Sequence, residues 1–582
     1  MKVNRRKLLS MVGVAPVALA ASPALADAAE KKAMPVVSTV AGKITAANPR
    51  GLPPAIQLIP MAPRLDALDG KTIYLVSDGF PSADLFLNQI KLWFAKSMPS
   101  VKTEYRLKAG AFADDDPKLF AEMKEKANGV IMAIGHCSTC TPATVGHCMT
   151  FEKMGLPSAP IVTIAFKDLA KSNAAKRGMP LERICFTPHP VWGKTEAEMM
   201  GYLEGNDPVS GKPFMKEVIS ALTTPLSADE QRTGSIVPPT GAPAFGPDTS
   251  RNLQQYYLDN GMTDGLPIIV PTDDLVEEML AATGHKPDEI VGKMTPAQGA
   301  FPAWTYNVRQ VAVNAVMAGA RPEYFPTILA IASTGISALF SSTNSLVSAA
   351  VINGPIRDKL QMNYGIGAMG PFNQVNATIG RAWTLISRNL DGGGIPGETY
   401  MGTQGNVINY SNLIIPENEK DSPWTPFHVQ KGFKPEDNVI SFFFGFGIQQ
   451  GQGGRGLGVK PVPHFHEAFA HNVSPFATIY GATFFVDPLV AHGLGDLGFK
   501  TKDDIADWLQ KNTIVSMKDV KSSLFSYPPR GPQAAALTDD STFPKWPNKD
   551  VFNFIVVGGQ TNPYHQLGNM SYRLSVSIDK WA

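Results

Sequence analysis

The sequence predicts an α/β fold, with a doubly wound parallel sheet in the N-terminal part and a larger mixed α/β domain behind it. Three observations support this prediction. Short apolar runs alternate with amphipathic segments between residues 71 and 190. The chain has 582 residues, which is enough for two large domains. A stretch rich in Pro, Gly, Thr and Ser separates two regions of regular periodicity.

The predicted organisation has five parts. They are a twin-arginine signal peptide (1–26), a linker or surface strap (27–68), an α/β domain (69–220), a Pro/Gly-rich linker (221–249) and a mixed α/β domain with Gly-rich loops (250–582).

The first 26 residues are predicted to be a signal and not part of the fold. Arg5 and Arg6 precede a modest apolar segment, and Ala24-Leu25-Ala26 is a small-x-small cleavage site. This pattern predicts export to the periplasm through the twin-arginine pathway. A short membrane anchor is the alternative, but the segment is short for a span. After cleavage we expect no membrane association.

Composition limits the classes of partner. Hydrophobic residues make up 44% and charged residues 18%, as in a globular protein. The formal net charge of +1 gives no reason to expect nucleic acid as a partner. The expected partner is a small-molecule substrate, and assembly into a homo-oligomer is left open. Four cysteines are too few for a disulfide scaffold but enough for a site.

Within the α/β domain, apolar runs and helical periodicity give the expected elements in order. The expected strands are 71–77, 101–108, 129–134, 159–166 and 183–188, and the expected helices are 83–96, 117–127 and 141–154.

A Cys-x-x-Cys motif is the central feature of this domain. Cys137 and Cys140 follow the strand at 129–134 and precede the next helix, for which Thr141 is the expected N-cap. Open α/β sheets place their chemistry at the carboxyl ends of strands, and a helix N-terminus favours a thiolate. The motif therefore predicts Cys137 as a reactive thiol and Cys140 as its resolving partner. A pair of inert buried cysteines is the alternative.

Other polar residues follow neighbouring strands at the same edge of the predicted sheet. Ser77, Asp78 and Thr141 are candidate substrate contacts, and His136 and His189 are candidate catalytic residues. A cysteine beside a histidine is the arrangement that nucleophilic catalysis needs. A charged His136 would stabilise a Cys137 thiolate. For His189, a solvated loop histidine is the alternative.

Metal binding is the second interpretation of the cysteines. Cys137, Cys140 and His147 could form such a site, although helix geometry argues against Cys148, which we expect in the core. A second candidate is His464, His466 and His471 with Glu467, because His-x-His on a strand puts both rings on one face. No cofactor is predicted firmly, and a metal ion remains an alternative.

The C-terminal region contains the long Gly-, Asn- and Pro-rich stretch 353–405, which we interpret as binding loops around a helix at 377–388. Asn376 and Arg381 are candidate substrate contacts there. Further helices are expected near 253 and at 275–282, 308–318 and 324–332, and strands at 439–446 and 551–557. Glu417 and Glu419 form a carboxylate pair that could do acid–base work.

The N-terminal domain resembles the UGSC family, in which a selenocysteine or cysteine is followed by Gly-Ser-Cys. The matching stretches are Ser77-Asp78-Gly79, Gly135-x-Cys137-x-x-Cys140-Thr141, Glu152-Lys153-x-Gly155-x-Pro157 and Pro188-His189-Pro190. The C-terminal domain resembles a region associated with the same group, at Asp264-Gly-Leu-Pro, Asn353-Gly-Pro, Asn376 to Arg381, Glu417-Asn-Glu419 and Ser422-Pro-Trp424.

The resemblance implies the same fold and a reactive role for Cys137 and Cys140, but it does not imply a reaction. The chain departs from the family pattern in three ways. The Gly-Ser pair is Ser138-Thr139, the usual acidic neighbour is His136, and the selenocysteine position is the ordinary Cys137.

Three classes of function follow. The first is a periplasmic thiol-dependent enzyme, an oxidoreductase or lyase, acting on a small molecule. The others are a metal-dependent protein and a non-catalytic ligand-binding protein. For the enzyme we expect the C-terminal loops to cover the Cys137 edge, because a catalytic thiol works best with water limited.

Overall fold

The computed structural model describes residues 42–110, 113–297, 300–450, 464, 466–470, 481–522, 536–546 and 548–582. The predicted signal peptide and His471 lie outside the described residues. Among the described helices, none combines the length and the apolar character that crossing a membrane would require.

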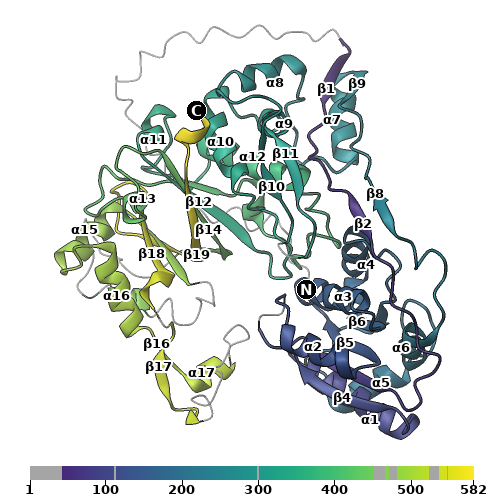
Figure 1. Cartoon of the computed structure of the whole chain (residues 1–582). Helices are drawn as coiled ribbons and strands as arrows, with labels where there is room; N and C mark the ends of the chain where they lie inside the picture. The colour runs from purple at the N-terminus through teal and green to yellow at the C-terminus, as the bar shows by residue number, and fades with distance from the viewer. Residues whose placement is uncertain are drawn as a thin grey trace, which may run out of the picture. The chain divides into compact units, whose positions relative to one another are not determined.

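The N-terminal domain is built on a five-stranded sheet in the order β4-β3-β5-β6-β7, with all neighbours parallel (Figure 1). The strands are β3 (Thr72–Ser77), β4 (Lys102–Leu107), β5 (Gly129–Gly135), β6 (Ser158–Thr163) and β7 (Cys185–Thr187). In chain order this is 2-1-3-4-5, one of the two common orders of doubly wound sheets. The predicted fold class is confirmed.

Helices cover both faces of this sheet. They are α1 (Ala83–Ser97), α2 (Pro117–Lys126), α3 (Cys140–Lys153), α4 (Lys167–Lys176), α5 (Glu196–Glu204) and α6 (Phe214–Thr223). Helices α1, α5 and α6 share one apolar cluster with the sheet, while α2, α3 and α4 contribute to the clusters that contain the remaining strand residues. The central strands β5 and β6 are buried along their whole length, which explains their continuous apolar character.

The first turn of α3 differs from the prediction. The helix begins at Cys140 with Thr139 as its N-cap, so the expectation that Thr141 is the N-cap was wrong. No side-chain oxygen caps the helix there. A backbone N–H of the first turn is bound instead by the Cys137 sulfur, as described below.

The C-terminal domain contains a mixed six-stranded sheet in the order β13-β12-β14-β19-β15-β18. Its strands are β12 (Val347–Asn353), β13 (Leu413–Pro416), β14 (Val439–Gln450), β15 (Ala482–Val486), β18 (Phe552–Val556) and β19 (His565–Ser577). The pairs β12–β13 and β15–β18 are parallel. The other three neighbouring pairs, β12–β14, β14–β19 and β19–β15, are antiparallel. One face of all six strands contributes to a single apolar cluster, which includes Phe443, Phe485 and Ile555.

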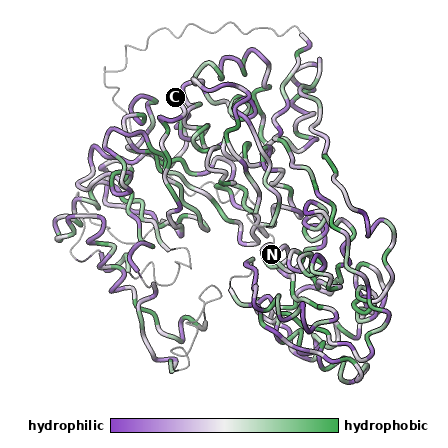
Figure 2. Tube along the Cα trace, in the orientation of Figure 1, coloured by the Kyte–Doolittle hydropathy of each residue, from purple (hydrophilic) through white to green (hydrophobic). Residues whose placement is uncertain are grey.

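The opposite face of this sheet is covered by two groups of helices. Helices α8 (Asp273–Leu280), α9 (Val308–Ala318), α10 (Phe325–Ser333) and α12 (Gln374–Asn389) form the largest core with β12 and β14, and α15 (Pro488–Asp496) and α16 (Lys502–Asn512) pack against β15 and β18. Figure 2 shows hydrophobic residues along the inner strands of each domain and hydrophilic residues on the outer helices.

The remaining strands and helices are shorter or more peripheral. They are α7 (Ser250–Asp259), β10 (Ile290–Met294), β11 (Trp304–Asn307), α11 (Ile356–Lys359), α13 (Phe427–Gln430), β16 (Ile514–Ser516), α17 (Met517–Ser522) and β17 (Thr542–Pro544).

The expected strap and the expected linker pair with each other. Strand β1 (Ile44–Ala47) pairs antiparallel with β9 (Ala244–Asp248), and β2 (Ile56–Leu58) pairs with β8 (Gly234–Ile236). Ala46 and Ala47 are buried in the core that β12 and α9 share. Residues 43–582 form one compact unit in which these ribbons join both domains.

Candidate active site

Cys137 lies where the strand order of the N-terminal sheet reverses. Strand β3 has β4 on one side and β5 on the other, so the crossovers leave β3 and β5 in opposite directions. Asp78 directly follows β3, and His136 and Cys137 directly follow β5. The crevice at such a reversal is the usual ligand site of open α/β sheets.

The Cys137 sulfur is bound at the N-terminus of α3. It accepts a hydrogen bond from the backbone N–H of Cys140 at 3.1 Å and lies 3.3 Å from the Thr139 hydroxyl. Burial raises the pKa of the Cys137 thiol, but hydrogen bonds from Cys140 and Thr139 outweigh this and lower the pKa to about 7. Cys137 remains partly exposed, so a reagent can reach it.

Cys140 has the opposite character. It is buried; its sulfur donates to the Cys137 carbonyl oxygen at 3.5 Å and accepts from the backbone N–H of His136 at 3.2 Å. Burial, with Cys137 and Asp78 close by, raises the pKa of the Cys140 thiol well above its usual value. The motif therefore combines a reachable thiol that ionises near neutral pH with a buried thiol that stays protonated.

The turn before the motif requires a glycine. A Cβ atom on Gly135 would lie 2.9 Å from Val162 Cγ2 and 3.1 Å from both Thr141 Cα and Thr141 Oγ1. Thr141 is buried against this turn, and among the described residues its hydroxyl has no hydrogen-bond partner. Thr141 is thus enclosed at the turn before the motif, and its role as a substrate contact stays a prediction.

Asp78 lies behind the two thiols. Its Oδ2 accepts from Ile134 N at 3.1 Å and from the Thr144 hydroxyl at 2.9 Å, and its Oδ1 accepts from Phe80 N at 3.2 Å. Burial raises the pKa of this carboxyl well above its usual value, although these hydrogen bonds oppose the change and the charge of Cys137 adds to it. Asp78 thus lies close enough to Cys137 and Cys140 for its charge to act on both thiols.

Ser77 has a local role. Its hydroxyl donates to Asp84 Oδ1 at 2.5 Å and accepts from Gly79 N at 3.1 Å, so it shapes the turn after β3. The residue is fully buried. Ser77 therefore supports the position of Asp78.

The two histidines lie close enough for their charges to interact. Burial, together with the charge of the nearby His189, lowers the pKa of His136 to about 4. With a pKa of about 4, His136 is neutral at pH 7, so the condition under which it would stabilise the thiolate, a charged ring, is not met. Burial also lowers the pKa of His189, whose Nδ1 lies 3.1 Å from the Thr163 hydroxyl.

This part of the chain also carries a similarity to a known protein family. Residues 45–203 match the UGSC family. The match runs from β1 into α5 and includes both cysteines, so it confirms the resemblance of the N-terminal domain. Comparison with the curated proteins and with the solved structures finds no match.

The UGSC family match ends before the C-terminal domain, whose resemblance stays a prediction. Within the matched region, the stretch that starts at Glu152 has a clear structural role. Glu152 is buried and accepts hydrogen bonds from Ala62 N and Ser158 N, both at 2.7 Å, and from Arg64 at 2.9 Å.

The alternative metal site in the UGSC-family region does not form. His147 lies seven residues after Cys140 on α3, which is about 10 Å along a helix. Its Nδ1 lies 3.6 Å from Asp115, and its ring packs edge-on against Phe120. The prediction that Cys137, Cys140 and His147 converge was wrong. As expected, Cys148 is buried in the core, as is Cys185.

Three ligating side chains do converge elsewhere. Across the described parts of the chain, the cluster found is His464, His466 and Glu467, whose ligand atoms all lie within 4.8 Å of one another. His464 lies in a turn and His466 in a helical stretch, so the two rings do not share one face of a strand. This cluster belongs to the C-terminal domain, outside the UGSC family match.

The C-terminal domain touches the motif at a residue that the sequence did not single out. Thr343 N donates to the Ser138 hydroxyl at 2.9 Å, and Ser138 is buried. This brings residues near 343 against the Cys-x-x-Cys loop. No motif marks Thr343, so only the fold reveals the contact.

Asn376 and Arg381 make their hydrogen bonds away from the thiols. Arg381 binds both oxygens of Asp264, at 2.7 and 3.0 Å, and the Pro267 carbonyl at 2.8 Å. Asn376 donates to the carbonyls of Asn363 and Ala368. In the described structure these two residues hold loops of the C-terminal domain.

Glu417 and Glu419 also have structural partners. Asn353 donates to both carboxylates, at 2.6 and 2.8 Å. Glu417 pairs with Lys502 at 2.5 Å and Glu419 with Arg357 at 2.9 Å. This buried network fixes the ends of β12 and β13, which explains the polar motifs there.

Proposed function

We propose that the protein is a thiol-dependent enzyme that acts on a small molecule, with Cys137 as the nucleophile and Cys140 as the resolving thiol. The observation that carries this proposal is the hydrogen bond from Cys140 N to the Cys137 sulfur at the start of α3. Because the pKa of Cys137 is about 7, roughly half of its thiol is ionised at neutral pH.

The contrast between the two thiols favours redox chemistry. In the first step the Cys137 thiolate attacks one sulfur of a disulfide substrate; the substrate S–S bond breaks, and one thiolate leaves. In the second step Cys140 loses its proton and attacks the Cys137 sulfur, which releases the second substrate thiolate. The enzyme ends with a Cys137–Cys140 disulfide, two electrons pass to the substrate, and an external thiol reductant restores the pair.

Asp78 supports the second step. Cys140 is buried with a high pKa, so it needs a base before it can attack. The Asp78 carboxylate, whose raised pKa makes it a better base than an exposed aspartate, accepts this proton and passes it to the leaving thiolate. A lyase that uses Cys137 alone is the alternative, but it gives no role to the buried Cys140.

The location that fits this chemistry is the periplasm. The Arg5-Arg6 motif and the small-x-small site support export of a folded protein. In an oxidising compartment a Cys-x-x-Cys pair can cycle between thiol and disulfide.

The rate of alkylation against pH tests the proposal. Reduced protein is treated with iodoacetamide, and modification of Cys137 is followed by mass spectrometry. We expect a midpoint near the pKa of about 7, below the value of about 8.5 for a free cysteine. Cys140→Ala should raise the midpoint, because alanine removes the side-chain hydrogen bond with Cys140 that helps to lower the pKa of Cys137.

Cys137→Ser is the matched control and should remove the fast reaction. A midpoint at or above that of a free cysteine would refute an activated Cys137. Turnover of a substrate should also be absent in Cys137→Ser. If the protein were instead a non-catalytic binding protein, Cys137→Ser would leave its ligand binding unchanged.

A further inference from the structure

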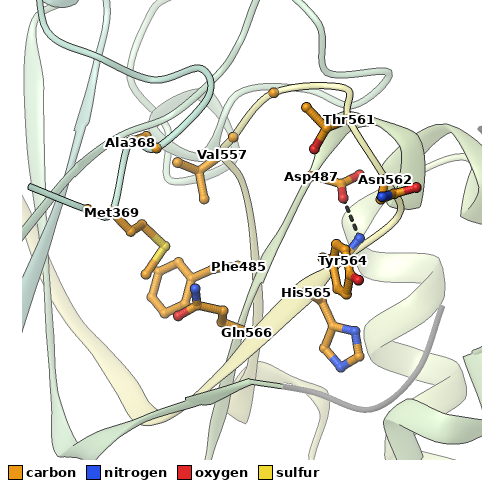
Figure 3. A pocket seen from close by; sticks show the side chains of 14 residues that line it. Ala368, Met369, Phe485, Asp487, Val557, Thr561, Asn562, Tyr564, His565 and Gln566 are labelled. Atoms are coloured by element: carbon orange, nitrogen blue, oxygen red, sulfur yellow. Dashed lines mark hydrogen bonds between the residues drawn. The ribbon is translucent and has the colours of Figure 1, made fainter. Parts of the chain in front are cut away.

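A cavity of about 310 Å³ lies in the C-terminal domain (Figure 3). It lies between the loop at 367–370, the ends of β15 and β18, and the start of β19. The lining residues with side chains that the argument uses are Met369, Phe485, Asp487, Thr561, Asn562 and Gln566.

The position of the cavity is one that sheets use for ligands. Strands β15 and β18 are parallel neighbours, so their carboxyl ends meet at the same edge. Asp487 directly follows β15, and Val557 and Gly558 directly follow β18. Both segments line the cavity.

The loop that forms one wall is held in place by side-chain amides. Asn373 Nδ2 donates to the carbonyls of Gly367, Ala368 and Gly370 at 2.8, 3.3 and 3.0 Å. Asn376 donates to Ala368 O at 3.3 Å, and Gly558 N donates to Tyr364 O at 2.9 Å. The cavity is therefore largely pre-formed, which lowers the cost of ordering it around a ligand.

The lining has an apolar side and a polar side. Figure 3 shows Met369 and Phe485 on one side, and Thr561, Asp487 and Asn562 on the other. The fourteen lining residues include one aspartate and one histidine, His565, but no lysine or arginine. This composition disfavours an anionic ligand and favours one that carries a positive charge or only hydroxyl groups.

Asp487 is the charged group at this site. One of its oxygens accepts from Val490 N at 2.9 Å, and the other accepts from Tyr564 N. The backbone N–H of Leu489 also hydrogen-bonds to this carboxylate, so one of its about four acceptor sites is left for a ligand. Burial raises the pKa of Asp487 to about 6, against the opposing hydrogen bonds, so the group is ionised above that pH but incompletely stabilised.

We propose that this cavity binds a small organic ammonium compound, with its cationic nitrogen at Asp487 and its apolar body against Met369 and Phe485. An ammonium group supplies N–H donors and a positive charge, and so gives the buried carboxylate a cationic partner. The site is distinct from the Cys-x-x-Cys motif, and the proposal does not depend on the thiol chemistry.

The test uses the full mature chain and three probes of similar shape: benzylamine, benzyl alcohol and benzoate. Binding is measured by isothermal titration calorimetry at pH 7.5. We expect benzylamine to bind most tightly, benzyl alcohol more weakly and benzoate not at all. Asp487→Asn should weaken benzylamine by at least about tenfold and leave benzyl alcohol nearly unchanged.

Two further variants make the result decisive. Asn is also a good N-cap, so Asp487→Asn should keep α15 intact. The circular dichroism spectrum of the variant checks this. Ala368→Leu narrows the cavity and should abolish binding of both benzylamine and benzyl alcohol. Cys137→Ser should leave the affinity for each of these probes unchanged. Equal affinity for benzoate, no binding of benzylamine to the wild type, or benzylamine binding unaffected by Asp487→Asn would each overturn the proposal.

Discussion

Cys137 and Cys140 differ in acidity because their surroundings differ, although they are only three residues apart. Backbone and hydroxyl donors at the helix start point at the Cys137 sulfur. Cys140 is enclosed in the protein interior, close to Asp78. The thiolate is thus stabilised by the helix terminus and hydrogen bonds, and not by a charged His136.

At this scale the role of Asp78 can be tested by Asp78→Asn. The variant is mixed with an aryl disulfide whose thiolate absorbs visible light. Attack by Cys137 releases the first aryl thiolate, and attack by Cys140 on the resulting mixed disulfide releases the second. Without a base, we expect the second release to slow by about a hundredfold and the first to change by less than about threefold.

Asp69→Asn is the control, because Asp69 binds Ser100 and precedes the start of β3, whereas Asp78 follows its end. It should leave both releases unchanged. An unaltered second release in Asp78→Asn would show that another group, or water, takes the Cys140 proton.

Among the elements, α3 does two things: its first turn binds the Cys137 sulfur, and its last turn holds the surrounding segments. Glu152 near its end binds Ala62 on the strap, Ser158 at the start of β6, and Arg64. The side chains of Arg64 and Glu152 are 1% and 0% exposed. The same carboxylate therefore ties α3, the strap and the start of β6 together.

Glu152→Ala should strongly destabilise the fold. Removing the carboxylate leaves Arg64 buried without its partner, which costs about 3–5 kcal/mol in the free energy of unfolding. Urea denaturation followed by fluorescence measures this change.

An exposed ion pair provides the comparison. Glu104 pairs with Arg106 on the surface, and Glu104→Ala should cost less than about 1 kcal/mol. If Glu152→Ala costs no more than Glu104→Ala, the buried pair does not hold these segments together.

For the whole molecule, export remains to be tested. Arg5→Lys together with Arg6→Lys should keep the protein in the cytoplasm at its unprocessed length, because the twin-arginine pathway recognises that pair. Cell fractionation and mass measurement of the product check this. The unchanged signal is the control, with cleavage expected after Ala26, and normal export of the double variant would contradict the assignment.

The interactions that the sequence predicted least well are also at this scale. Arg381 was expected to contact a substrate, but it binds Asp264, which lies 117 residues earlier in the chain. Ser138 and Thr343 meet across 205 residues. Nothing in the local pattern around either pair indicates its partner.

The sequence by itself determined the five strands of the N-terminal domain, its first three helices, and the position of Cys137 between a strand and a helix. These features follow from local periodicity and turn chemistry, which neighbouring residues encode. Only the tertiary structure decided that His136 is neutral, that Asp78 lies behind the thiols, that His147 is remote from them, and that Asp487 faces a cavity. Each of these depends on burial and on contacts between distant segments, and burial is the property that sets the charge of an ionisable group.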